Sequence, residues 1–256
     1  MNNRIFNIFS IVLILVWIWA DRHFQIGSPA YGWLLFIYVS VLFCGSYFIQ
    51  WGFFLKSVNG IKTNEKSIAL TFDDGPAGTK TAHILDILKE NKMEATFFCI
   101  GKNIAGNENL LKQIKEDGHI IGNHSYSHHF WFDLFSTKKM MSDVQMMSEM
   151  VKDNTGSRPK LFRPPYGVTT PNMKKVMQRG GYTAIGWNIR SLDTVIKDEE
   201  KLLKKIDAML QPGSIILLHD TSKTTLAVLP RLIVAARNKG YEFVRADKLL
   251  NVAPYG

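Results

Sequence analysis

The hydrophobic residues are unevenly distributed along the chain, and their pattern divides it into two parts. The first part contains two long apolar runs, Ile5–Ala20 and Trp33–Leu55, separated by a short polar break. From residue 67 onward, short apolar runs alternate with longer segments whose apolar positions recur at helical spacing. We therefore predict an N-terminal membrane anchor over residues 1–56, a linker over 57–66 and one soluble domain over 67–256.

Both apolar runs are candidate membrane spans. The second is long enough to cross a bilayer, which takes about 20 residues, whereas the first is marginal. Tryptophans lie at the ends of both runs, as in an interfacial belt. The residues before Asp21 lack the small-x-small pattern of a signal-peptide cleavage site. We therefore expect an integral protein of a bacterial-type cell membrane, anchored by a hairpin of two uncleaved helices. A secretory signal followed by a buried helix is the alternative.

The charges leave open on which side of the membrane the domain lies. Lys and Arg flank the outer ends of the hairpin, and only Arg22 lies in its loop, which favours a cytoplasmic domain. If only the second run spans, the domain can be extracytoplasmic. Outside residues 1–56, 28 Lys and Arg stand against 21 Asp and Glu. This excess favours anionic partners such as phosphorylated lipid carriers or acidic glycans, and the anchor argues against nucleic acid.

The soluble part has the pattern of a βα repeat. The runs predicted as strands are 67–72, 95–100, 119–122, 161–163, 182–187, 214–218 and 241–245. The segments predicted as helices are 81–91, 109–117, 137–153, 171–179, 199–210 and 225–239. Such an alternation indicates an α/β domain with a parallel sheet or barrel of about seven strands.

Polar side chains follow the predicted strands at the point where each one ends. They are Asp73, Asp74, His124, Arg163, Asp193 and His219. The carboxyl ends of parallel barrel strands converge on one face, where active sites form, so we expect these side chains to meet there. For the stretch around Asp73 taken alone, a strand followed by an ordinary Asp-Gly turn is the alternative.

Three of these side chains suit a divalent metal. His124 and His128 are four residues apart, which in a helical turn would place both imidazoles on one face. With Asp74 they form an Asp-His-His set, and three protein ligands leave a coordination position open for water and substrate. Such a metal would acidify a water molecule and polarise a carbonyl group.

The remaining polar side chains suit the proton transfers of hydrolysis. Asp73 could act as the general base, with Arg163 keeping it ionised and oriented. His219 could protonate a leaving amine, and Asp193 could raise its pKa and fix its orientation. Together these groups predict hydrolysis of an amide or an ester.

Four motifs are similar to those of the polysaccharide deacetylase family, which is the NodB-homology domain of carbohydrate esterase family four. They are TFDDGP at 71–76, HSYSH at 124–128, RPPYG at 163–167 and LLH at 217–219. The resemblance implies a distorted (β/α) barrel and metal-dependent removal of N-acetyl groups from sugars such as chitin oligomers or peptidoglycan. It also implies Zn²⁺ as the most suitable metal.

The resemblance assigns roles to individual positions. Its implied metal ligands are Asp74, His124 and His128, and its implied catalytic residues are Asp73 as base, His219 as acid, and Arg163 and Asp193 as their partners. The backbone N–H of Tyr166 would be the oxyanion donor, and Leu217 would line the acetyl pocket, with Pro164 and Trp187 as further substrate-binding residues.

A fifth family motif departs from its usual form. The family often has Asp-x-x-Asp-Trp, and here the corresponding stretch starts at Arg190 and ends at Thr194, with Asp193 kept. Because the Trp helps to wall the substrate groove, its loss puts the usual glycan substrate in question while the chemistry is unaffected. Three functions compete: deacetylation of a cell-wall or surface glycan, deacetylation or deformylation of an amino sugar on a lipid carrier, and an inactive carbohydrate-binding scaffold.

Overall fold

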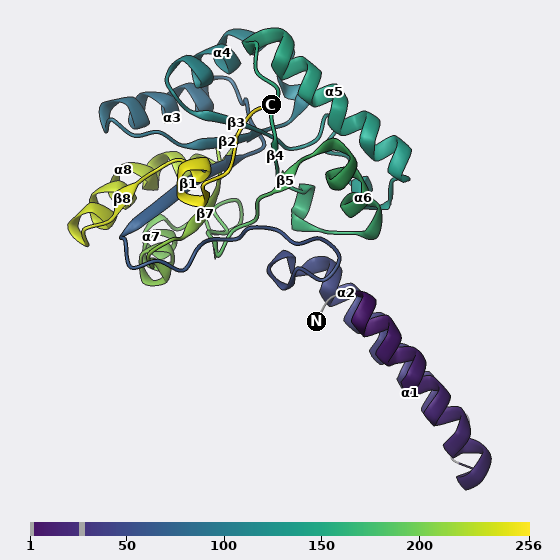
Figure 1. The fold of residues 1–256 in the computed structure, drawn as a ribbon. Coiled ribbons are helices and arrows are strands. Elements are labelled where there is room, and N and C mark those ends of the chain that lie inside the picture. Colours follow the sequence, from purple (N-terminus) through teal and green to yellow (C-terminus); the bar gives the residue numbers. More distant parts are fainter. Residues whose placement is uncertain (1–2, 26–28) are drawn as a thin grey trace.

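The computed structural model describes residues 3–25 and 29–256. The chain begins with two long helices, α1 (Asn3–Phe24) and α2 (Pro29–Tyr47), which project side by side from the rest of the molecule (Figure 1). The ring of Phe6 in α1 stacks on that of Tyr38 in α2, with 5.4 Å between the ring centroids. A short 3-10 helix, η1 (Ile49–Trp51), follows and leads into the α/β domain.

Only the first of these helices is long and apolar enough to cross a membrane within the described residues, which reverses the expectation from the sequence. Helix α1 has 22 residues, whereas the shorter apolar helix Tyr31–Tyr47 stays below the length of a span. A signal sequence near an N-terminus would pass the same test as α1. The apolar run predicted to continue to Leu55 leaves the α2 helix at Tyr47. Beyond it, Ile49 and Leu55 are buried in the core of the domain, and Phe53 packs back against Phe6 of α1.

The domain is built on a curled, open parallel sheet. Its strands are β1 (Ser67–Asp73), β2 (Thr96–Cys99), β3 (Ile120–Asn123), β4 (Leu161–Phe162), β5 (Thr183–Ala184), β6 (Ile189–Arg190), β7 (Ile215–His219) and β8 (Glu242–Phe243). Seven of them lie in the order β5-β4-β3-β2-β1-β7-β6, and β8 pairs with β1 beside this path. The paired strands are parallel, so the predicted distorted (β/α) barrel of about seven strands is confirmed, in the form of a curled half-barrel.

Helices cover the outer face of this sheet (Figure 1). They are α3 (Thr79–Glu90), α4 (Glu108–Glu116), α5 (Thr137–Thr155), α6 (Pro171–Gly180), α7 (Glu199–Met209), α8 (Lys223–Asn238) and the short α9 (Ala246–Leu250). The shorter 3-10 helices are η2 (Gly101–Asn103), η3 (Phe132–Leu134) and η4 (Pro165–Gly167). Strand β6 and helix α9 were not predicted, since each is too short to give a periodic pattern.

In strand β1, alternate side chains point to the core beneath the helices and to the inside of the half-barrel. Ile68, Leu70 and Phe72 join the apolar core beneath the helices. Successive side chains of a strand point to opposite faces, so Thr71 and Asp73 turn into the inside of the half-barrel. The same alternation on the neighbouring β7 places a carboxylate and an imidazole on one inner wall, because Asp73 and His219 are register partners.

The edge strands β5 and β6 do not pair with each other within the described sheet. Residues 58–61 instead connect β5 at one edge with the start of β7, the neighbour of β6. Val58 forms a parallel bridge with Ile185 beside β5, and Gly60 forms an antiparallel bridge with Ser214 at the start of β7. The N–H of Ile61 donates to the carbonyl of Gly213 at 3.0 Å. The segment predicted as a linker is therefore hydrogen-bonded into the barrel.

Candidate active site

A pocket of about 260 Å³ opens at the carboxyl ends of the strands. It is lined by Asp73, Asp74, His124, His128, Pro164, Tyr166, Gly167, Trp187, Arg190, Leu192, Thr194, Val195, Leu217 and His219. Arg163 and Asp193, both with no exposed surface, lie behind this lining. The structure thus brings together all of the residues that the sequence suggested for the site.

The three expected ligands have the spacing that a tetrahedral cation requires. The Oδ1 atom of Asp74 lies 3.6 Å from Nε2 of His124 and 3.4 Å from Nε2 of His128. The ligand atoms of the three residues lie within 4.8 Å of one another. Ligands about 2.0–2.2 Å from a tetrahedral Zn²⁺ are roughly 3.3–3.6 Å apart, so the donor set fits such an ion.

The hydrogen bonds of His124 leave its other nitrogen free for a cation. Its Nδ1 lies 2.7 Å from the carbonyl oxygen of Arg163, which can only accept, so Nδ1 carries the proton. Burial is the main reason that the pKa of His124 falls to about 3, and burial also lowers the pKa of His128. Both imidazoles are therefore neutral at ordinary pH, as metal ligands must be.

The loop that carries the two histidines is not helical, which corrects the expectation of a helical turn. Ser125 and His128 have φ values of 67° and 43°, in the left-handed region. The side chain of Asn123 accepts from the Ser125 N–H at 2.8 Å, and the Ser125 hydroxyl accepts from the His128 N–H at 3.0 Å. Asp143 accepts from the Tyr126 N–H at 2.7 Å. These side chains hold a tight loop that folds one imidazole over the other.

Asp73 is held by a buried guanidinium. Its Oδ1 accepts from NH1 of Arg163 at 2.7 Å, and the same nitrogen donates to the hydroxyl of Thr71 at 2.7 Å. The remaining nitrogens of Arg163 donate to the carbonyls of Gly186 and Ile185 at 2.8 and 3.2 Å. Burial raises the pKa of Asp73 above its ordinary value, and the charge of Arg163 opposes this rise. The result is an oriented carboxylate of increased basicity.

His219 is paired with a buried carboxylate that lies behind the pocket lining, just after the neighbouring strand β6. Its Nδ1 donates to Oδ1 of Asp193 at 2.8 Å. Burial lowers the pKa of His219, but the hydrogen bond and the charge of Asp193 outweigh it and raise the value to about 9. Asp193 in turn accepts from the hydroxyls of Ser191 and Thr225 and from the His219 N–H, and its own pKa is lowered despite burial. The imidazole is therefore protonated at neutral pH and able to give its proton to a base.

The four residues expected to contact substrate all line the pocket. Leu217 and Trp187 are buried at 4% and 5% exposure, and Pro164 lies beside them. The indole N–H of Trp187 is buried and has no hydrogen-bond partner among the described residues. Tyr166 stands at the mouth with φ 59° and is half exposed.

Sequence reasoning missed the residues that hold the chemistry in place. Thr71 could have been found, because it lies two positions before Asp73 on a strand and so shares its face. Thr225 gave no signal, because its hydroxyl reaches Asp193 across the fold. Ser191 and Asn123 bond to Asp193 and to the Ser125 N–H two residues further along the chain, which apolar periodicity does not reveal.

The two departures from the family motif lie at the rim of the pocket. Thr194 and Arg190 both line it, and NH1 of Arg190 donates to the hydroxyl of Tyr47 at the end of α2, at 3.4 Å. Where the family often has an acidic residue, this chain therefore has a cation that contacts the N-terminal helices.

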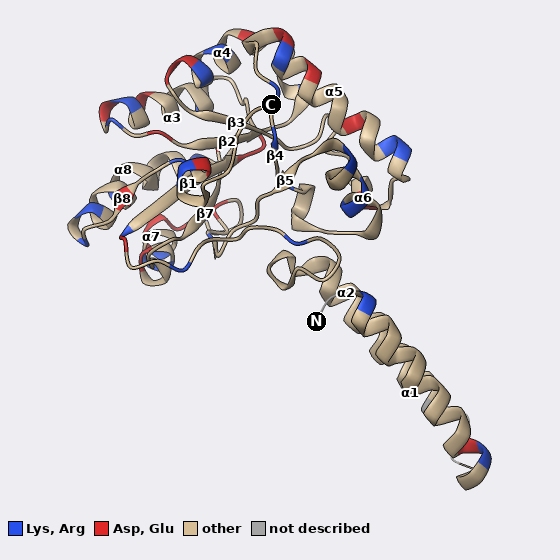
Figure 2. Ribbon diagram, viewed as in Figure 1, with Lys and Arg blue, Asp and Glu red and all other residues tan. Residues whose placement is uncertain are grey.

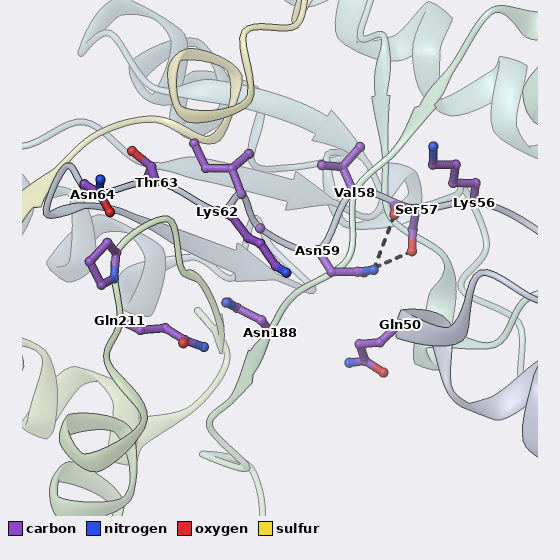
Figure 3. Close-up of a pocket in the computed structure, with 13 residues that line it drawn as sticks. Gln50, Lys56, Ser57, Val58, Asn59, Lys62, Thr63, Asn64, Asn188 and Gln211 are labelled. Atoms are coloured by element: carbon purple, nitrogen blue, oxygen red, sulfur yellow. Dashed lines mark hydrogen bonds between the residues drawn. The ribbon is translucent and has the colours of Figure 1, made fainter.

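A larger cavity of about 1000 Å³ lies elsewhere, between residues 56–64 and the barrel (Figure 3). Its lining includes Lys56, Lys62, Asn59, Asn188 and Gln211 but no histidine or carboxylate. Figure 3 shows the amide and ammonium groups spread around an open space. Because it lacks a group that could act as base or metal ligand, the smaller pocket is the candidate for catalysis.

Comparison with known proteins agrees with this geometry. A model of the polysaccharide deacetylase family matches residues 60–185. A peptidoglycan-N-acetylglucosamine deacetylase of Bacillus cereus is 34% identical over 199 residues, covering 74% of this chain and 91% of that protein. The chain belongs to the polysaccharide deacetylase family. The resemblance carried by the four motifs is thereby confirmed.

Two further polysaccharide deacetylases match about three quarters of the chain. The peptidoglycan-N-acetylglucosamine deacetylase PgdA of Listeria monocytogenes is 38% identical over 188 residues, which are 73% of this chain but only 39% of PgdA. The chain thus spans well under half the length of that relative. Among solved structures, the Bc1960 peptidoglycan N-acetylglucosamine deacetylase superposes with a TM-score of 0.73 at 29% identity, covering 77% of this chain and 93% of the other.

Proposed function

We propose that this chain is a metal-dependent hydrolase that removes the N-acetyl group from an N-acetylated sugar of a peptidoglycan-type or surface glycan. The observation that carries the proposal is the convergence of Asp74, His124 and His128 between the buried Asp73 and the protonated His219. Relatives named as peptidoglycan deacetylases support the choice of substrate class. The bounds of the catalytic domain, residues 67–256, are part of the proposal.

The donor set suits one divalent cation, and we propose Zn²⁺. When bound, the cation supplies Lewis acidity to the acyl carbonyl and to a water molecule. Asp74 with the two imidazoles would hold it, and the Nδ1–H···O bond of His124 to the Arg163 carbonyl fixes the ring that ligates it.

The side chains then carry out the proton transfers. Asp73, oriented by Arg163, accepts a proton from the attacking water, whose oxygen bonds to the acyl carbon. The backbone N–H of Tyr166 donates to the carbonyl oxygen as it gains charge. His219 gives its proton to the sugar nitrogen as the C–N bond breaks, which releases acetate and the amino sugar. Leu217, Pro164 and Trp187 enclose the acyl group and the sugar edge.

The test is acetate and amine release by the full-length chain in detergent micelles, with N-acetylglucosamine oligomers and peptidoglycan fragments as substrates. Chelation should abolish the release, and added Zn²⁺ should restore it. N-formylated oligomers in the same assay distinguish the two acyl groups. Release that persists in a chelated protein without bound metal would contradict the mechanism, and absence of release from every acylated sugar would favour the inactive scaffold.

We also propose that α1 and α2 insert together as a hairpin, which makes the protein integral to the membrane. Large apolar side chains of both helices face outward, among them Phe9 and Leu15 in α1 and Leu35 and Phe36 in α2. A hairpin places both chain ends on one side, so reporters fused at residue 1 and after Gly256 should be active on the same side of the membrane. Reporters active on opposite sides would favour a single span, and the active side locates the domain.

A further inference from the structure

The end of the helical pair is fixed directly to the rim of the catalytic pocket. Ser46 and Thr169 exchange two hydrogen bonds, N–H of Thr169 to the carbonyl of Ser46 at 2.9 Å and the Ser46 hydroxyl to the carbonyl of Thr169 at 2.7 Å. Gln50 donates to the carbonyl of Trp187 at 3.2 Å, and Arg190 bonds to Tyr47. Since Trp187 and Arg190 line the pocket, a membrane that holds α1 also lies close to the pocket mouth.

Large apolar side chains are exposed on the side of the domain where the helical pair joins it. The loop after the metal ligands presents Phe130, Trp131 and Leu134 with 66%, 56% and 67% of their surface exposed. The buried residues of this loop, Phe132 and Phe135, pack in one cluster with Leu55, so the loop is tied to the base of the helical pair. The acidic side chain in the loop, Asp133, is half-buried between the buried Phe132 and the exposed Leu134.

The charges on this side are basic. Helix α6 and the segment leading into it lie beside the end of α2, and Figure 2 shows Lys and Arg along α6 (Figures 1 and 2). These residues are Lys174, Lys175 and Arg179; all are exposed, and the helix contains no acidic residue. The opposite, inner side of α6 is apolar and packs into the core, so the basic side is its free surface. Aromatic tips beside a basic helix are what an interfacial membrane contact requires.

We infer that the rim of the catalytic pocket docks on an anionic bilayer surface, so that the enzyme works on N-acylated sugars held at that surface. Phe130, Trp131 and Leu134 enter the headgroup layer, and the cations of α6 face its phosphates. The choice of substrate rests on the proposed deacetylase function, whereas the docking does not. A sugar linked through phosphate to a lipid would lie at the bilayer surface, close to the pocket mouth, and its phosphate would carry the charge that Arg190 attracts.

The docking is tested by depth measurement on the full chain in lipid nanodiscs. An environment-sensitive NBD label is placed at Leu134→Cys, in a Cys44→Ser background that leaves only the buried Cys99. The matched control is Lys112→Cys on α4, which lies away from the helical pair (Figure 1). In phosphatidylglycerol nanodiscs the label at 134 should shift to the blue and be quenched by doxyl lipids, whereas the label at 112 should not. Two equally water-exposed labels would overturn the inference.

Turnover provides the second readout. Lys174→Gln/Lys175→Gln should lower the rate on a synthetic N-acetylglucosaminyl lipid in anionic nanodiscs by about ten-fold and leave the rate on soluble N-acetylglucosamine oligomers unchanged. The charge-matched control Lys89→Gln/Lys152→Gln changes exposed lysines of α3 and α5 and should have no effect on either substrate. An equal loss of rate on both substrates, or no loss of rate on the lipid-linked substrate, would contradict the docking. If no substrate is turned over while the label at 134 is buried in lipid, the proposed function fails and the docking stands.

Discussion

Replacing Asp193 by Asn tests the electrostatic account of the catalytic acid. Asp193 raises the pKa of His219 to about 9. Without its charge the value should return to 6.5 or lower, because burial, the largest influence on this imidazole, is then opposed only by the smaller effects of the charges of Asp73 and Asp74. A change of this size corresponds to about 3 kcal/mol in favour of the charged imidazole. The acid works in its protonated form, so activity is present below its pKa and is lost above it.

The consequence is a variant whose defect depends on pH. At pH 8 the protonated fraction of His219 should fall roughly thirty-fold in Asp193→Asn, whereas at pH 6 it should fall less than about two-fold. The assay is kcat/KM for release of acetate between pH 5 and 10. The basic limb of the profile should move from near pH 9 to pH 6.5 or below, and Asp86→Asn on the exposed side of α3 should leave it in place. A basic limb that stays where it is would refute the assignment.

The same pair makes a prediction for stability. The folded-state pKa of His219, about 9, exceeds the 6.5 of the unfolded chain, so its protonation contributes stability that is complete below pH 6.5. That contribution is lost as the pH rises through about 9. Asp193→Asn should therefore destabilise the protein more at pH 6 than at pH 10 in urea unfolding. A destabilisation independent of pH would mean that Asp193 acts only through its neutral hydrogen bonds.

Four further substitutions test other parts of the site and the core. Asp73→Asn should lower turnover by about 10²–10⁴-fold with metal content unchanged, whereas His128→Ala should lose the metal as measured by mass spectrometry. Arg163→Met should lower the free energy of unfolding in urea by about 3–5 kcal/mol, because it leaves Asp73 buried and unpaired. Adding Asp73→Asn should restore part of this free energy. Burial lowers the pKa of His119 to about 4, so stability is lost as pH falls from 6.5 toward 4. In His119→Gln, the thermal unfolding temperature should fall less steeply between pH 6.5 and 4. An unchanged fall would mean that other groups cause the loss of stability at acid pH.

The sequence predicted the arrangement of the site because that arrangement follows from strand periodicity. Asp73 and His219 end two apolar runs, and parallel strands bring such ends to one edge without further information. The conformation of the loop at His128 could not be predicted in this way. Its left-handed residues Ser125 and His128 are held by the nearby side chains of Asn123 and Ser125, and Asp143, distant in the sequence, accepts from the Tyr126 N–H between them. Apolar periodicity encodes none of these hydrogen bonds.

The helical pair shows a different limit of sequence reasoning. The mostly apolar run from Trp33 to Leu55 contains no charged residue, and its length alone indicated one membrane span. In the structure Ile49 and Leu55 are buried against protein, with 1% and 6% exposure, while α2 ends at Tyr47. Hydrophobicity reports that a side chain leaves water, but it does not say whether lipid or protein replaces the water.

The hydrogen bonding of residues 58–61 to β5 and to the start of β7 limits how the chain can be shortened. A recombinant fragment starting at Ser67 would keep every strand of the sheet but would expose the backbone of Ala184 and Gly213, which now bond to Val58 and Ile61. One starting at Ser57 would retain these bonds but would uncover the core at Ile49 and Leu55. The boundary for a secreted or crystallisable version thus lies directly after α2, at Phe48.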